Sequence, residues 1–298
     1  MKRIKITHII NPVKVPESSD LFIAQPVTFE TMKRAKEMAK DKVDVNLITT
    51  QYPEDCKIIP DYFIKTKNLE RSVLDVGTFR KQRKLPILQD ILERAVGYDT
   101  NADYIIYTNV DIALMPHFYL FVNQKIQEGL DAFVINRRTI SKHYTLETLD
   151  QAYSDLGKKH PGFDCFVFKT ELYPNFNLNN VAIGVSKVGI TLLANMLCFS
   201  TKFEIFEDKH LTFHIGEDKI WQNDSLKDYF KYNSEQAHKT YLWLLGYKAS
   251  LLSNPLFSKH LSLLEIETGN ENQIKKTKKG VFQNLQIKIN KIWRKKYS

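Results

Sequence analysis

The chain has 298 residues, 43% of them hydrophobic, which is enough to bury a full core and favours one large α/β domain with an appendage over two independent domains. Its three cysteines are odd in number and widely spaced, which argues against a disulfide framework or a zinc site and indicates a reducing, cytoplasmic setting. No export signal is visible in the first residues, and the longest apolar stretch, around residues 190–199, is about half the ~20 residues that a membrane-spanning helix needs.

The formal net charge of +9 is concentrated at one end of the chain. Residues 273–298 contain nine of the 43 basic residues and no aspartate or glutamate. The remaining 34 basic residues equal the 34 acidic residues, so residues 1–272 are formally neutral. The charge pattern therefore argues against nucleic-acid binding by the body of the protein and sets the tail apart.

Strand-like and helix-like segments alternate through the first half, which is typical of a mostly parallel sheet with helices on its faces. Residues 28–40 read as a helix between the first two strands, with Thr28 as a candidate cap and a buried stripe of Phe29, Met32, Ala35 and either Met38 or Ala39. The strand candidates in this half are Ile4–Ile10, Val45–Thr49 and Tyr104–Thr108.

A second helix is expected to start near Pro86, because the first helical turn does not need the N–H that proline lacks. Two interpretations are open for the basic cluster just before it. The cluster is either a solvated helix entrance, or it supplies one or two cations to a diphosphate at the helix N-terminus. Its members are Arg80, Lys81, Arg83 and Lys84, and the apolar stripe of the helix is Leu85, Leu88, Ile91, Leu92 and Ala95.

The strand candidate at 104–108 ends in Asn109-Val110-Asp111. In open α/β sheets, ligands gather outside the carboxyl ends of such strands. An ionised carboxylate there is a candidate ligand for Mg²⁺ or Mn²⁺, which in turn holds a diphosphate. The alternative is that Asn109 and Asp111 only satisfy backbone donors in the following turn.

The second half continues with a helix at about 116–128, a strand at Ala132–Asn136 and a polar, weakly periodic stretch at 137–159 that suggests a substrate loop. A turn at His160–Gly162 then leads into an aromatic strand. Two further short strands are expected at Phe203–Phe206 and Leu211–His214, and residues 234–267 look mostly helical.

Taken in order, these segments resemble nucleotide-sugar glycosyltransferases of the GT-A fold, and most closely a bacterial polysaccharide-associated group with an Asn-x-Asp version of the Asp-x-Asp motif. The resemblance covers roughly residues 4–216. It rests on Leu85-Pro-Ile-Leu-Gln-Asp-Ile-Leu92, Asn109-Val-Asp111-Ile, Asn136-Arg137-Arg138, Asp164-Cys-Phe-Val-Phe, Leu172-Tyr-Pro, Ala182-Ile-Gly184 and Thr212-Phe-His214.

The resemblance implies a nucleotide-sugar donor and a role for each motif residue. Asp111 would bind Mn²⁺ or Mg²⁺, and Asn109 would bind ribose or a metal-bound water. His214 would reach back to the metal or diphosphate, although a histidine after an apolar run is more often a core or turn residue. Asp164 would meet sugar or acceptor hydroxyls, or else cap the Pro161-Gly162 turn. The expected cations at the donor are Arg83, Lys84 and Arg137.

One departure concerns the general base. The family pattern usually brings an aspartate onto the helix after Ile-Gly, whereas this chain has Val185-Ser-Lys-Val-Gly189-Ile there. Asp164, Glu217 or Asp218 would have to substitute, unless the reaction takes a retaining route without such a base or the protein is inactive.

The basic tail reads as an amphipathic helix that binds an anionic membrane surface. A disordered, solvated tail is the alternative, and a nucleic-acid-binding tail lacks any element that reads bases. The apolar side holds Phe282, Leu285, Ile289, Ile292 and Trp293, and the basic side holds Lys288, Lys291, Arg294 and Lys295.

The sequence thus predicts a metal-dependent glycosyltransferase at the cytoplasmic membrane face, acting on a glycan or lipid-linked glycan in surface polysaccharide synthesis. A catalytically silent GT-A-like module that binds membrane or a partner glycosyltransferase is the alternative. The expected domains are a catalytic unit at 1–216, with a nucleotide-binding half at 1–112 and a sugar and acceptor half at 113–216, then a helical extension at 217–272 and the tail at 273–298.

Overall fold

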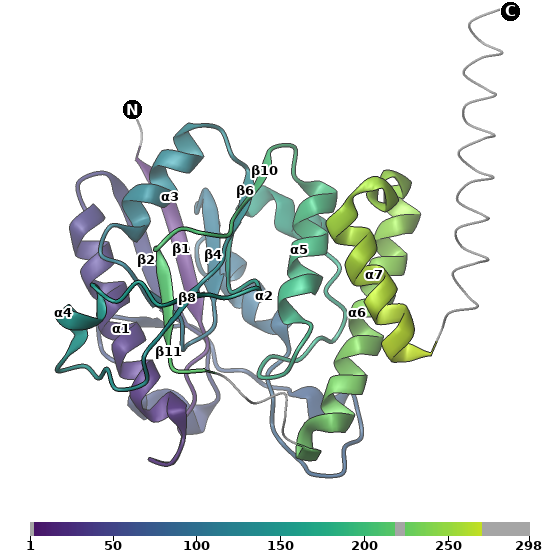
Figure 1. Ribbon diagram of the computed structural model, residues 1–298, viewed down its shortest axis with the longest axis horizontal. Helices are drawn as coiled ribbons and strands as arrows, with labels where there is room; N and C mark the ends of the chain where they lie inside the picture. Colours follow the sequence, from purple (N-terminus) through teal and green to yellow (C-terminus); the bar gives the residue numbers. More distant parts are fainter. Residues whose placement is uncertain (1–2, 218–223, 270–298) are drawn as a thin grey trace, which may run out of the picture.

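The computed structural model describes residues 3–217 and 224–269, and the predicted membrane-binding tail lies outside these residues. The described strands form a seven-stranded sheet in the order β10-β6-β9-β4-β1-β2-β3. In it only β9 runs antiparallel to its neighbours, which confirms the predicted α/β class with a mostly parallel sheet (Figure 1). The strands are β1 (Ile4–Ile10), β2 (Val43–Thr49), β3 (Ile64–Lys65), β4 (Tyr104–Thr108), β6 (Ala132–Ile135), β9 (Cys165–Lys169) and β10 (Phe203–Phe206).

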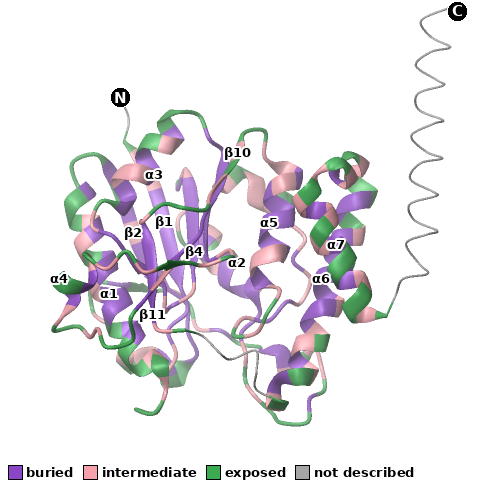
Figure 2. Ribbon diagram, in the orientation of Figure 1, coloured by how far each residue is buried: buried purple, intermediate pink, exposed green. Residues whose placement is uncertain are grey.

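Helices cover both faces of this sheet, and its strands are buried between them (Figure 2). On one face α1 (Asp20–Ala39) and α3 (Phe118–Gln127) contribute to a core with β1, β2 and β4. On the other face α2 (Leu88–Tyr98) and α5 (Val188–Phe199) pack against β4, β6 and β9. Burial on both faces explains why these strands read as continuous apolar runs.

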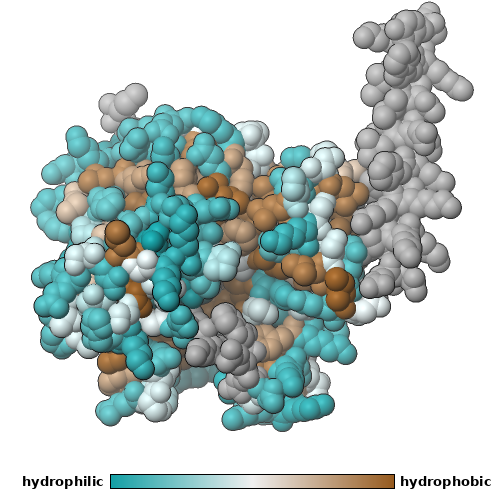
Figure 3. Space-filling view, viewed as in Figure 1, coloured by the Kyte–Doolittle hydropathy of each residue, from teal (hydrophilic) through white to brown (hydrophobic). Residues whose placement is uncertain are grey.

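Two C-terminal helices extend the α5 side of the molecule. Helix α6 (Lys227–Tyr247) packs on α5 through Ala237 and Tyr241, and α7 (Pro255–Thr268) completes the same apolar cluster. Helix α7 starts where the Asn254 side chain accepts hydrogen bonds from two backbone N–H groups, and it ends at Gly269, whose φ is +69°. Figure 3 shows hydrophobic residues at the surface over α7. Within this helix, Leu263 and Ile266 are exposed.

A second, smaller sheet is built from short segments that follow the main strands. Its order is β5-β11-β7-β8, with α4 (Leu149–Ala152) between β7 and β8 along the chain. The strands are β5 (Ala113–Leu114), β7 (Arg138–Ile140), β8 (Lys158–Lys159) and β11 (Thr212–Ile215), and short 3₁₀ turns occur at Pro53–Ile58, Val73–Asp75, Thr170–Asn175, Asp224–Leu226 and Ala249–Ser253.

Most expected elements are confirmed, with two corrections. The first helix begins at Asp20 rather than at Thr28, which lies inside it, and of the two alternatives for its stripe Ala39 is buried whereas Met38 is exposed. The stretch at 137–159 is not irregular throughout, because β7 and β8 pair within the second sheet. Within the described residues, no helix combines the length and the apolar character that crossing a membrane requires.

Candidate functional site

Three polar side chains converge where β4, β6 and β9 meet. Because β9 is antiparallel, its first residue, Cys165, is paired with the last residues of both neighbours, Thr108 of β4 and Ile135 of β6. The residues just beyond these pairs are Asn109, Asn136 and Asp164. The topology therefore gathers them at the edge where ligands collect in α/β sheets.

The second sheet brings His214 to Asp111. Strand β11 pairs with β5, which follows Asp111, and with β7, which follows Arg137. His214 Nε2 lies 3.2 Å from Asp111 Oδ2, and the two side chains are 3% and 12% exposed. The other carboxylate oxygen of Asp111, Oδ1, is buried and has no hydrogen-bond partner among the described residues. The predicted proximity of these two residues is thus present in the fold.

The hydrogen bond on the far side of His214 fixes its tautomer. His214 Nδ1 lies 2.8 Å from the carbonyl oxygen of Gly216, which only accepts, so Nδ1 carries the hydrogen. Nε2 then faces the Asp111 carboxylate either as an imidazolium donor or as a lone pair. A lone pair opposite a carboxylate oxygen suits a cation shared by the two groups.

These residues fit a divalent cation of the Mg²⁺ or Mn²⁺ type. A buried carboxylate oxygen without a donor and an imidazole nitrogen give two ligands, and such ions commonly complete their shell with waters and substrate phosphates. No group of three or more His, Cys, Asp or Glu side chains gathers anywhere in the described part of the chain, so the protein alone does not build a closed metal cage there.

Asn109 presents one end of its amide to the protein. Its Oδ1 accepts a hydrogen bond of 2.8 Å from the Tyr107 hydroxyl, and burial raises the pKa of that hydroxyl, which keeps it a donor. The amide nitrogen of Asn109 takes no part in this hydrogen bond and can donate to another group. An amide N–H can donate to a hydroxyl or a water but does not bind a metal cation.

Arg137 and Asp164 form a buried ion pair on the other side of the same edge. The distance from Arg137 Nη1 to Asp164 Oδ1 is 3.6 Å, and the side chains are 5% and 10% exposed. A Cβ at Gly189 would lie 2.7 Å from the carbonyl oxygen of Phe163, so glycine allows the first turn of α5 to approach the residue before Asp164.

The basic cluster before α2 is held by α6. The Tyr229 hydroxyl accepts a hydrogen bond from the Arg83 backbone N–H and donates one to the Lys81 carbonyl, both 2.7 Å long. The Arg83 side chain reaches Ser225 Oγ at 3.2 Å. Lys84 pairs with Glu54 at 2.7 Å and lies 3.8 Å from the centre of the Tyr52 ring. Arg83 and Lys84, two of the three predicted donor-binding cations, are thus positioned by Tyr229, Ser225, Glu54 and Tyr52.

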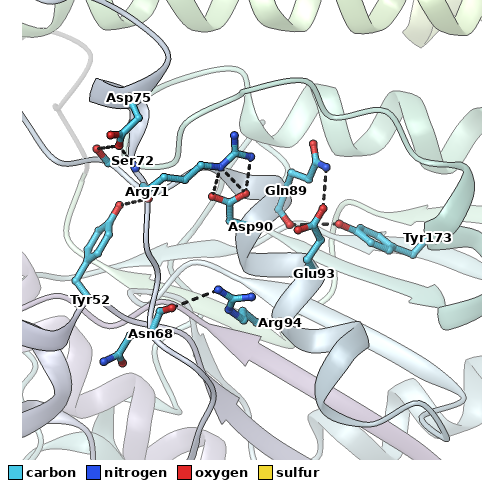
Figure 4. Close-up of polar contacts among 10 residues, drawn as sticks. All are labelled: Tyr52, Asn68, Arg71, Ser72, Asp75, Gln89, Asp90, Glu93, Arg94 and Tyr173. Carbon is cyan, nitrogen blue, oxygen red and sulfur yellow. Dashed lines mark hydrogen bonds and ion pairs between the residues drawn. The ribbon is translucent and has the colours of Figure 1, made fainter.

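A polar network attaches the preceding loop to α2 (Figure 4). Arg71 forms a two-pronged ion pair with Asp90, with its shortest contact at 2.7 Å, and its carbonyl accepts from the Tyr52 hydroxyl. Ser72 and Asp75 cap the short turn that follows. The loop that carries the basic cluster is therefore fixed to α2 through Arg71 and to α6 through Tyr229.

Several residues stand apart from these contacts. Glu217 is exposed just after Gly216, and Asp218 lies outside the described residues. Asn136 belongs to the Asn136-Arg137-Arg138 motif but was not predicted as a site residue. It is buried, and its Oδ1 lacks a hydrogen-bond partner among described residues. Its position directly after β6, like that of Asn109 after β4, could have marked it in the sequence as a candidate site residue.

No protein-family model and no curated protein sequence matches the chain. Among solved structures, it is similar to a fragment of S. aureus TarS in complex with UDP-GlcNAc, with a TM-score of 0.47 and 7% identity over 89% of this chain and 82% of that one. A Desulfovibrio desulfuricans protein assigned as a nucleotide-diphospho-sugar transferase gives a TM-score of 0.38 and 10% identity, over 80% of this chain and 99% of that one.

A third similar structure is 4-diphosphocytidyl-2C-methyl-D-erythritol synthase from Anaerococcus prevotii, with a TM-score of 0.39 and 11% identity over 73% of this chain and 94% of that one. These similarities are distant, and the function proposed next rests on the side chains at the sheet edge.

Proposed function

We propose that the protein is a metal-dependent glycosyltransferase that moves a sugar from a nucleotide-sugar donor to a glycan or lipid-linked glycan. The observation that carries the proposal is the buried Asp111 carboxylate at the end of β4, with His214 at 3.2 Å on one oxygen and no partner among described residues on the other. Such an oxygen is costly to bury unless a ligand takes it up.

In this proposal the chain divides the work of holding the donor. Asp111 and His214 hold the cation, which neutralises the charge that develops on the leaving nucleoside diphosphate. Asn109 donates its amide N–H to a hydroxyl or a water. Arg83 and Lys84 reach the diphosphate from the loop that Tyr229 fixes. Their side chains add positive charge at the leaving group, in addition to that of the cation.

Asp164 is our candidate for contacting the acceptor or the sugar hydroxyls. Of the two described candidates for the general base, Asp164 is buried at the sheet edge and Glu217 is exposed. Arg137 Nη1 lies 3.6 Å from Asp164 Oδ1, so this pair places a carboxylate with a partner cation at the sheet edge. The anionic membrane surface enters this proposal through residues 273–298, which would bring the enzyme to a lipid-linked acceptor.

The test is calorimetry of UDP, GDP, CDP and the matching sugar nucleotides, with and without Mn²⁺, on the wild type and on Asp111→Ala. We expect one base to bind in a metal-dependent manner and the binding to be lost in the variant. Asp103→Ala is the matched control, because Asp103 precedes the same strand at its opposite end and accepts from the Lys5 N–H at 2.8 Å. It should leave nucleotide binding unchanged.

Two results would overturn the proposal. If none of the nucleotides binds with or without metal, the silent membrane-binding or partner-binding module becomes the better description. If binding persists in Asp111→Ala with its metal dependence intact, the donor site lies elsewhere.

A further inference from the structure

A second cavity lies away from Asp111, between the loop at 174–180 and the carboxyl ends of α5 and α6. Its volume is about 610 Å³, within the range of about 300–1,000 Å³ that small-molecule sites occupy. Phe199 ends α5, and Pro174 lies in the turn after β9, so both come from the sheet edge opposite to Asn109 and Asp164. None of the residues that line this cavity belongs to the donor site described above.

Aromatic rings form one wall of the cavity. The rings of Trp243 and Tyr247, one turn apart on α6, are 6.0 Å apart and inclined by 17°, and Phe199 lies 4.9 Å from Tyr247. Trp243 is 44% exposed and Tyr247 is 64% exposed. Large rings held nearly parallel and left open to solvent present a flat apolar face that the fold itself does not use.

Amide residues make up most of the remaining lining. They are Gln89, Asn175, Asn177, Asn179 and Asn180, and no Asp, Glu, Lys or Arg is among the described residues that line the cavity. Amides both donate and accept hydrogen bonds, as the hydroxyl groups of a sugar also do. Because charged groups are lacking, this lining suits a neutral, hydroxyl-rich ligand better than a phosphate or a nucleotide.

The loop that carries these amides is held in place. The buried Asn195 side chain accepts from the Asn177 N–H at 2.7 Å and donates to the Asn177 carbonyl at 2.9 Å. Asn179 has a φ of +48° and donates to Thr240 Oγ1 of α6 at 2.8 Å. Gln89 is held on α2, where its backbone carbonyl accepts from the Tyr173 hydroxyl and its side-chain amide donates to Glu93 (Figure 4). A fixed loop presents its amides without a large ordering cost on binding.

We propose that this cavity binds neutral carbohydrate. The C–H face of a sugar ring stacks on Trp243 or Tyr247, and its hydroxyls exchange hydrogen bonds with the amides of Asn175 and Asn180. The site is separate from the Asp111 centre, so carbohydrate binding here does not depend on the transfer reaction.

The experiment uses the full chain labelled with 5-fluorotryptophan, so that ¹⁹F NMR follows Trp243 directly, with Trp243→Phe to assign its signal. The probes are neutral trisaccharides of glucose, galactose, mannose and N-acetylglucosamine. We expect at least one to shift the Trp243 signal saturably. The concentration dependence of this shift gives the Kd of the trisaccharide. Tyr247→Ala and Asn180→Ala should each raise this Kd by at least tenfold.

The controls are two variants and one alternative probe, anionic phospholipid vesicles. Tyr98→Ala removes another exposed tyrosine, which lies at the end of α2 outside the cavity, and should leave the Kd unchanged. Asp111→Ala should also leave it unchanged, which separates this site from the donor site. Failure of all four trisaccharides to give a saturable shift overturns the proposal, as does a shift produced instead by anionic phospholipid vesicles or one that Tyr247→Ala does not alter.

Discussion

The His214 imidazole lies 3.2 Å from the Asp111 carboxylate, although 103 positions separate the two residues in the chain. The contact exists because β11 is paired on one side with the strand that follows Asp111 and on the other with the strand that follows Arg137. The pairing of β11 with β5 and β7 therefore positions His214 next to Asp111. Substitutions that disturb this small sheet should alter the candidate metal site.

His214→Ala should weaken Mn²⁺ binding by about 10- to 100-fold, because it removes a nitrogen next to the carboxylate and its Gly216 contact. Titration of the metal, followed by calorimetry, measures the change. His117→Ala alters an exposed histidine just before α3 and serves as the control. Equal affinities in His214→Ala and wild type would show that the imidazole is not a ligand.

Arg137→Met should destabilise the fold by about 3–5 kcal/mol, because it leaves the Asp164 carboxylate buried beside a neutral side chain. Urea denaturation gives the free energy of unfolding. Lys159→Met removes an exposed cation that pairs with Asp208 at 2.7 Å and should cost at most about 1 kcal/mol. Similar losses in the two variants would contradict the assignment of a buried pair.

Tyr229→Phe should lower the unfolding free energy by about 1–3 kcal/mol and weaken binding of a nucleoside diphosphate, because two hydrogen bonds that position the Arg83 loop are lost. Tyr232→Phe is a close control. Tyr232 lies on the same helix and also contacts Phe79, but its buried hydroxyl has no hydrogen-bond partner among described residues. If Tyr229→Phe binds the nucleotide with the affinity of the wild type, the loop that carries Arg83 does not contribute to the donor site.

His8 should make the protein less stable at mildly acidic pH. Burial lowers the pKa of His8 to about 3, from an ordinary value near 6.5. Between pH 6.5 and pH 3, His8 is therefore protonated in the unfolded chain but stays neutral in the folded protein. This difference lowers the free energy of unfolding by up to about 1.4 kcal/mol for each pH unit of acidification.

Denaturation at a series of pH values tests this, with His8→Gln as the comparison. The variant loses contacts to Tyr119 and Thr108 and should be less stable at pH 7, but its stability should fall less steeply on acidification. Parallel pH profiles for wild type and variant would rule out His8 as the source.

Local pattern accounts for most of the main sheet. The strands at 4–10, 104–108 and 203–206 have the predicted bounds, since each is a short run of β-branched and aromatic residues that ends at polar residues. The start of α1 was misplaced because the helix continues upstream through Pro26, where packing of Ala24 and Val27 outweighs the lost backbone hydrogen bond. The strands within 137–159 were missed because β7 pairs with β11, 75 residues further along the chain, and β8 in turn pairs with β7.

By itself, the sequence determined that a carboxylate, Asp111, follows a buried strand and that a histidine, His214, lies in a later one. Only the tertiary structure decided that the two meet, that Arg137 pairs with Asp164, and that α6 holds the basic loop while building an aromatic and amide cavity with α5. The reason is physical: the period and length of an apolar run specify an element locally, whereas contacts between distant residues depend on how all the elements pack together.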